Sequence, residues 1–112
     1  MFKVDKNFNI TITKGDTGYL RLKAPRYKIK EGDTVKFTVG YVQGVGVQKE
    51  KKFQIEGTKE EGIARIKIEP KHTQSMDIGK YHYDIEITTT EKDVFTVIGP
   101  CEFEIVGGVT VD

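Results

Sequence analysis

The amino-acid sequence predicts one all-β domain over residues 1–112, built as a sandwich of antiparallel strands. Apolar and polar residues alternate with a period of two through most of the chain, as in strands that bury one face. Thr, Val, Ile, Phe and Tyr fill the alternating positions, and no apolar stripe with the helical period of about 3.6 residues continues beyond one turn. Gly, Asp and Asn separate the runs. We therefore expect about seven or eight strands around a single core.

The alternating runs follow one another along the chain, and each predicts one strand. Their apolar positions are Phe8, Ile10 and Ile12; Tyr19, Leu20 and Leu22; Val35, Phe37 and Val39; Ala64, Ile66 and Ile68; Tyr81, Tyr83, Ile85 and Ile87; Phe95 and Val97; and Phe103 and Ile105. Two runs follow the tripeptide Gly-Asp-Thr, which begins at Gly15 and at Gly32. We expect tight turns there, with a positive φ at the glycine and hydrogen bonds from neighbouring amides to Asp16 and Asp33.

The segment between residues 40 and 55 has two interpretations. In the first, its glycines loosen a loop that presents apolar side chains to a partner. The candidate contact residues are Tyr41, Val42, Val45 and Val47. In the second, which we favour, Val45 and Val47 begin a strand that continues to Phe53 and Ile55. Its lysines would then protect an edge strand against unwanted pairing.

A short helix is predicted only near Pro70. The fixed φ of proline suits the first position of a helix, so we expect a helical turn over residues 71–76. Gly79 then begins the next strand.

The stretch "DIGKYHYDIEI" contains Asp77, Gly79, Tyr81 and Tyr83 in the spacing D-x-G-x-Y-x-Y. This spacing resembles the tyrosine corner of immunoglobulin-like sandwiches, where a tyrosine hydroxyl binds backbone a few residues upstream. Tyr83 occupies the position of the usual disulfide cysteine. The resemblance implies an immunoglobulin-like fold in which an aromatic ring closes the core in place of a disulfide.

The opposite face of the same predicted strand carries His82, Asp84 and Glu86. Alternate strand positions project together, so these three side chains could ligate a metal ion. One histidine and two carboxylates are also common on a solvated strand face. We favour the solvated face and expect no metal and no cofactor.

Composition excludes several other classes of protein. The chain has 18 Lys and Arg against 17 Asp and Glu, interspersed, so nucleic acid is not an expected partner. Cys101 is the single cysteine, which excludes an internal disulfide, and we expect it to be a half-buried packing thiol.

Charges at Lys3, Asp5 and Lys6 do not fit a signal peptide, and no apolar run is long enough to insert into a membrane. The single serine, Ser75, has no nucleophile motif, so we expect no enzyme.

Several short sequence segments occur along the chain in a characteristic order. The most specific of these segments are "GKYHYDIEI" from Gly79 and "DVFTVIGP" from Asp93. From Phe8 to Thr110 the chain resembles small tailed-phage and prophage proteins of Gram-positive, particularly clostridial, bacteria. It is similar to the N-terminal immunoglobulin-like domain of phage baseplate upper proteins. The resemblance implies a non-catalytic virion component that contacts other baseplate proteins, with a homo-oligomer as a further possibility. Such a protein resides in the bacterial cytoplasm during assembly and then in the virion tail or baseplate.

A carbohydrate-binding sandwich that contacts host-surface glycans is the alternative. Such sites usually stack sugars on exposed aromatic rings. The chain has no tryptophan, and most Tyr and Phe residues fall at inward positions, which leaves Tyr27 and Tyr41 as the candidates.

Overall fold

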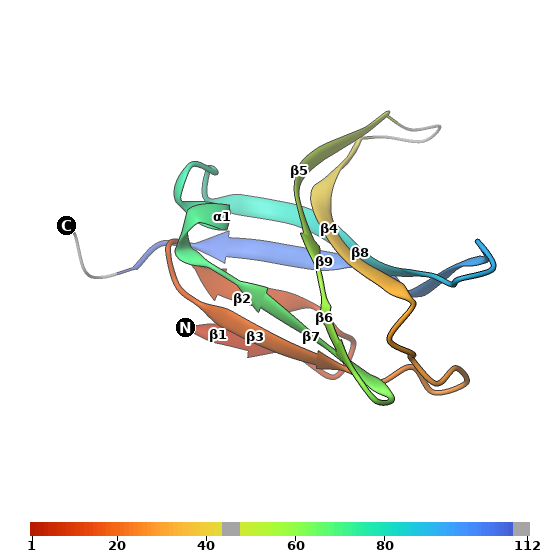
Figure 1. The fold of residues 1–112 in the computed structure, drawn as a ribbon. Coiled ribbons are helices and arrows are strands. Elements are labelled where there is room, and N and C mark those ends of the chain that lie inside the picture. Colours follow the sequence, from red (N-terminus) through yellow and green to blue (C-terminus); the bar gives the residue numbers. More distant parts are fainter. Residues whose placement is uncertain (44–47, 109–112) are drawn as a thin grey trace.

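The structure, a computed structural model, describes residues 1–43 and 48–108. The larger sheet contains, in spatial order, β1 (Phe2–Val4), β2 (Ile10–Thr13), β9 (Val94–Val106), β8 (Gly79–Thr88), β4 (Thr34–Gln43) and β5 (Gln48–Glu56). The smaller sheet contains, also in spatial order, β3 (Gly18–Leu22), β7 (Ile63–Ile68) and β6 (Thr58–Glu60). Figure 1 shows the sheets as two layers, with helix α1 (Pro70–Gln74) at one end. The predicted all-β sandwich is confirmed.

The strand pattern differs from the prediction in three ways. The described residues form nine strands, because β1 and β6 have three residues each and are too short to show an alternating pattern. The runs around Phe95 and Phe103 belong to one strand, β9, whose pairing with β8 shifts register near Ile85. Strand β2 pairs with β9 in parallel, with Ile10 opposite Phe103, so the sandwich is not purely antiparallel.

The core lies between the two sheets and consists of the inward positions of the alternating strands. Phe37, Tyr83 and Phe103 are buried at its centre, with ring centroids 5.0 Å apart for Phe37 and Tyr83 and 6.1 Å apart for Phe37 and Phe103. Phe53 of β5 adds a fourth ring, 6.0 Å from Phe103. Tilted and edge-on contacts of this kind stabilise an aromatic cluster beyond the area that it buries.

Three aromatic residues predicted to face inward are exposed instead. Phe8 is 52% exposed, Tyr19 68% and Phe95 44%. Phe8 has φ of 65°, which breaks the alternation before β2 begins at Ile10. Tyr19 lies between Gly18 and Leu20, the residues that face the core, and therefore points outward.

The two Gly-Asp-Thr turns use their glycines differently. Gly15 has φ of 85°, as predicted. Gly32 is not among the glycines with positive φ, so that prediction was wrong. A Cβ at Gly32 would lie 2.5 Å from the Thr90 methyl group, so a side chain at this position would require Thr90 to shift. The predicted role of Asp33 is confirmed, since its buried carboxylate accepts the Lys30 N–H at 2.8 Å.

Helix α1 begins one residue earlier than the expected turn and ends at Gln74, two residues before the expected end. The His72 N–H donates to the Glu69 carbonyl oxygen, and His72 Nδ1 accepts the Glu69 N–H at 2.8 Å. The His72 ring stacks on Phe53 of β5 with centroids 5.0 Å apart. The helix therefore covers the aromatic cluster on the β5 side.

Candidate interaction groove

The tyrosine-corner residues lie together where β8 begins. The buried Tyr81 hydroxyl donates to the Asp77 carbonyl oxygen at 2.7 Å, which is the hydrogen bond that defines a tyrosine corner. Burial raises the pKa of Tyr81 to about 12, so the hydroxyl remains a donor at neutral pH. Gly79 has φ of 153°, a backbone conformation that other residues rarely adopt. This set stabilises the start of β8.

Tyr83 has a second role that sequence reasoning missed. Its ring packs on Phe37 and Phe103 in the core, while its hydroxyl donates to the Phe8 carbonyl oxygen. Burial raises the pKa of Tyr83, which keeps the proton on the donor. The two residues are 75 positions apart in the chain, so no local pattern indicates the contact.

Cys101 lies beside the hydrogen bond between Tyr83 and Phe8, and it is opposite Tyr83 in the pairing of β8 with β9. The thiol is half-buried and lies 3.7 Å from the Asn7 carbonyl oxygen, within range of a weak hydrogen bond. Burial raises the pKa of Cys101, which disfavours the nucleophilic thiolate. Cys101 lies in the interior of β9.

The loop from Asp5 to Asn9 is ordered by one carboxylate. Asp5 Oδ1 accepts the N–H groups of Asn7 at 2.8 Å and Asn9 at 3.0 Å, and these bonds lower the pKa of Asp5. Phe8 lies between them in the left-handed region, which costs a side-chain-bearing residue about 1–2 kcal/mol. Asp5 and Tyr83 together hold this strained turn and keep the Phe8 ring at the surface.

The exposed Phe8 ring lines a groove of about 550 Å³ between β3 and the larger sheet. Its lining includes Tyr83 and Ile85 of β8, both buried, and Val97 and Ile98 of β9, both half-buried. On the β3 side the lining includes Leu20 and Leu22. Leu20 occupies an inward position yet remains half-buried, because the sandwich is open along this side.

Exposed apolar side chains concentrate at this groove. Seven large hydrophobic residues are exposed in the described parts of the chain, and three of them line the groove: Val4 (38%), Phe8 (52%) and Tyr19 (68%). Scattered single apolar residues are normal on a protein surface, but several around one cavity indicate a binding site. We refer to this cavity as the β3 groove.

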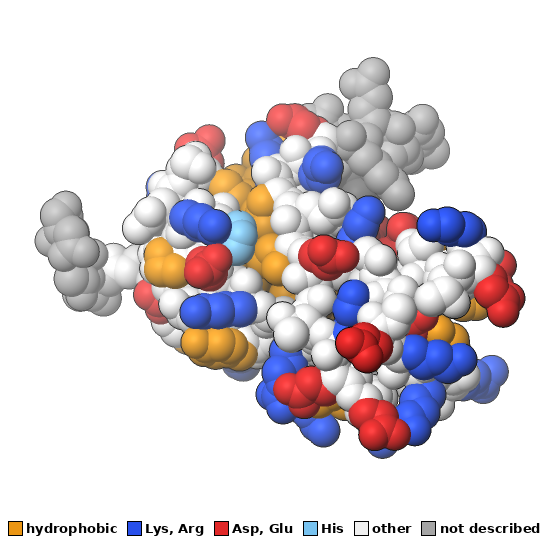
Figure 2. Space-filling model, viewed as in Figure 1, with side chains coloured by type: hydrophobic (Ala, Val, Ile, Leu, Met, Phe, Trp, Pro, Cys, Tyr) orange, Lys and Arg blue, Asp and Glu red, His pale blue; other side chains and the backbone are white. Residues whose placement is uncertain are grey.

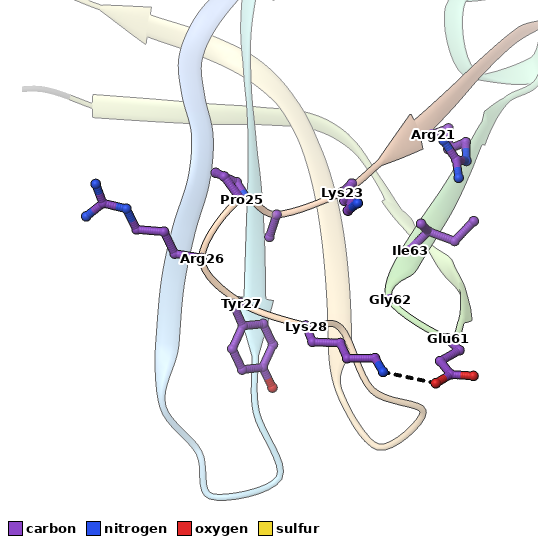
Figure 3. Close-up of a pocket in the computed structure, with 10 residues that line it drawn as sticks. Arg21, Lys23, Pro25, Arg26, Tyr27, Lys28, Glu61, Gly62 and Ile63 are labelled. Atoms are coloured by element: carbon purple, nitrogen blue, oxygen red, sulfur yellow. Dashed lines mark hydrogen bonds and ion pairs between the residues drawn. The ribbon is translucent and has the colours of Figure 1, made fainter.

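A second, more polar pocket adjoins the β3 groove through the shared residues 21 and 23–25. This basic pocket has a volume of about 630 Å³, and Figure 3 shows the residues that line it. Four cationic side chains and one carboxylate contribute to its lining: Arg21, Lys23, Arg26, Lys28 and Glu61. The Glu61 carboxylate is engaged by Lys28 Nζ at 3.0 Å. Elsewhere on the side of the molecule shown in Figure 2, basic and acidic side chains are interspersed.

The predicted partner-contact residues lie away from the β3 groove. Tyr41 is half-buried, and its ring stacks on Tyr81 at 4.6 Å and lies under Lys52 Nζ at 5.2 Å. Val42 is in β4, where its backbone pairs with Lys49 of β5. Val45 and Val47 lie outside the described residues, and β5 begins at Gln48. Tyr41 therefore packs in part against its own domain, and its role as a partner contact stays a prediction.

The second glycan candidate, Tyr27, is also engaged within the domain. It is half-buried, and its hydroxyl donates to Asp33 Oδ2 at 2.7 Å. Its ring lies 5.9 Å from Phe95. The rings that are exposed are those of Phe8, Tyr19 and Phe95.

The metal-ligand candidates of β8 do not form a metal site in the described residues. His82, Asp84 and Glu86 are half-buried on the outer face of β8, and residues 1–43 and 48–108 hold no group of three or more His, Cys, Asp and Glu that could bind a metal ion. The one helix found in these same ranges is far too short to cross a membrane. The β3 groove is thus the strongest candidate site in this part of the chain.

A similar fold occurs in a protein of known structure. The structure is similar to the 1.4 Å crystal structure of an uncharacterized protein from Bacillus anthracis str. Ames, with a TM-score of 0.52 and 14% sequence identity. The match covers 85% of this chain and 75% of that chain. No protein-family model and no curated protein matches the sequence. At this level of identity the comparison shows a shared fold and nothing about activity.

Proposed function

We propose that this protein is a phage or prophage structural protein, associated with the virion baseplate, that acts as a non-catalytic protein–protein interaction module. The single observation that carries the interaction role is the β3 groove, where exposed apolar side chains surround a cavity beside an open edge of the sandwich. The virion assignment depends on the sequence phrases "GKYHYDIEI" and "DVFTVIGP".

The chemistry of the groove favours a protein partner over a glycan. A sugar-binding site needs a flat aromatic ring on which the sugar stacks and several polar groups around that ring to bind the sugar hydroxyls. The groove lining contains mainly aliphatic side chains, and its charged members are Arg21 and Lys23. Aliphatic walls with a few charges at one end fit the side chains of another protein better. Tyr27 and Tyr41, the rings that the sequence offered for a glycan site, are engaged within the domain, and the exposed Phe8 and Tyr19 rings lie beside these aliphatic walls.

The virion assignment is tested in the bacterium that encodes the chain. Cells are treated with a DNA-damaging agent, tailed particles are purified by density, and their tryptic digest is searched for the peptide Tyr81–Lys92. We expect this peptide in stoichiometric amounts relative to known tail proteins. Its absence from particles, with the protein abundant in the same lysate, would contradict the assignment.

A matched pair of variants tests whether the groove makes the contact. Phe8→Ser removes an exposed ring from the groove, whereas Ile78→Ser removes a side chain that is 60% exposed and lies outside it. We expect Phe8→Ser to reduce incorporation into particles and Ile78→Ser to leave it unchanged. Equal incorporation of both variants would show that the contact surface lies elsewhere.

A further inference from the structure

We propose that β3 accepts an extended segment of the partner protein as an added strand, with apolar side chains in the β3 groove and carboxylates beside Arg21, Lys23 and Arg26. This inference rests on the proposed function, because it names the kind of segment that the interaction module would bind. Backbone hydrogen bonds would give affinity, and alternate side chains would give specificity.

The first requirement for strand addition is a free strand edge. Strand β3 is the terminal strand of the smaller sheet, and in the described residues β7 is its one hydrogen-bonded neighbour. Strand β1 lies near it, with the Phe2 ring over Gly18, but β1 pairs with β2 of the larger sheet. The backbone N–H and C=O groups on the outer side of β3 are therefore available to another strand.

The second requirement is space for the inward side chains of the added strand. Strand β3 has five residues and spans about 17 Å at about 3.3 Å per residue. An added strand of this length directs every second side chain to the same face, so two or three of them enter the groove. Leu20, Val97 and Ile98 are half-buried around this space, and apolar side chains placed there would complete their burial.

The third observation is the charge at one end of the groove. Its lining contains Arg21 and Lys23 and no carboxylate. Beyond Leu22 the basic pocket adds Arg26 and Lys28, and its one carboxylate, Glu61, is engaged by Lys28. A segment with acidic residues at the end nearest Leu22 complements these charges. We therefore infer a partner segment that alternates apolar residues and carries carboxylates at one end.

Synthetic peptides of defined chemistry test this inference on the full chain. Because the orientation of the added strand is open, two probes carry Asp-Glu before or after the alternating segment Val-Thr-Val-Thr-Val. Matched controls carry Lys-Lys in place of Asp-Glu, or a sequence of the same composition without alternation. Fluorescence anisotropy of labelled peptides gives the affinities. We expect one acidic alternating peptide to bind at least about tenfold more tightly than both of its controls.

Charge-swap variants locate the contact. Arg21→Glu together with Lys23→Glu should weaken binding of the acidic peptide and strengthen binding of the lysine peptide. Lys36→Glu together with Lys51→Glu makes the same change in charge on exposed residues of β4 and β5 and should alter neither affinity. An equal loss in both double variants would indicate a general charge effect and overturn the inference.

The remaining outcomes are decisive against the proposal. No binding of either acidic peptide at millimolar concentration would overturn it, as would equal binding of the acidic and lysine peptides. Tighter binding of a single-stranded oligonucleotide than of the peptides would assign the basic pocket to nucleic acid. Self-association of the chain that Phe8→Ser abolishes would assign the groove to a second copy. Incorporation into particles is measured separately, so strand addition can fail while the proposed function stands.

Discussion

The two sides of the sandwich differ in how well the core is covered. On the β5 side, Phe53 packs on Phe103 at 6.0 Å and is covered by the His72 ring at 5.0 Å. On the β3 side no helix covers the gap in the described residues, and Leu20 remains half-buried beside the groove. The aromatic cluster is therefore covered on the β5 side, whereas the β3 side has an apolar groove that no helix of the described residues covers.

Strands β5 and β3, each at the edge of its sheet, show the same contrast. Strand β5 carries the exposed charged residues Glu50, Lys51 and Lys52. Charged side chains on an edge strand discourage pairing with other chains. Strand β3 instead has Tyr19 exposed and an apolar cavity beside it. The first edge is protected against association, and the second has the features of a docking edge.

The largest expected effect is a stability difference between the two sides. Phe103→Ala removes a buried ring from the aromatic cluster and should lower the free energy of unfolding by about 3–5 kcal/mol. Phe8→Ala removes an exposed ring from the groove and should change it by less than about 0.5 kcal/mol. Urea denaturation of both variants measures the difference. Similar losses would show that the groove side also supports the fold.

A smaller effect separates the two tyrosines of β8. Tyr81→Phe and Tyr83→Phe each remove one hydrogen bond to a backbone carbonyl and should each cost about 1 kcal/mol. Only Tyr83→Phe releases the Phe8 carbonyl, so we expect it alone to shift the NMR resonances of the Asp5–Asn9 loop. Unchanged resonances in this loop would show that the Tyr83 hydroxyl does not hold it.

The smallest expected effect is a dependence of stability on pH that originates at His72, on the β5 side. Burial and the neighbouring Lys71 lower the pKa of His72 below 6.5, although Glu69 opposes the shift. Between the lowered pKa and 6.5 the unfolded chain binds more protons than the folded chain, so stability falls as pH is lowered through this window.

Denaturation at pH 7.5 and pH 5.5 measures this loss. His72→Gln should reduce the difference between the two pH values, and His82→Gln serves as the matched control. A pH dependence that His72→Gln leaves unchanged would place its origin in another group.

The sequence predicted features that depend on near neighbours. Alternation predicted β4 and β8, and the bond from Tyr81 to Asp77 joins residues four positions apart. The groove depends on distant contacts. It exists because β1 pairs with β2 and not with β3, and because the Tyr83 hydroxyl binds the Phe8 carbonyl oxygen from 75 positions further along the chain. Neither feature leaves a periodic signal, so Phe8 and Tyr19 were predicted to face inward.

Amide hydrogen exchange, followed by NMR with and without the acidic alternating peptide, tests the central claim most directly. In the free protein we expect the outward amides of β3 to exchange faster than those of β4 and β8, which have neighbours on both sides. On addition of peptide, protection should rise in Gly18–Leu22 and stay unchanged in β5. Protection that rises along β5 and not along β3 would contradict the assignment of β3 as the docking edge.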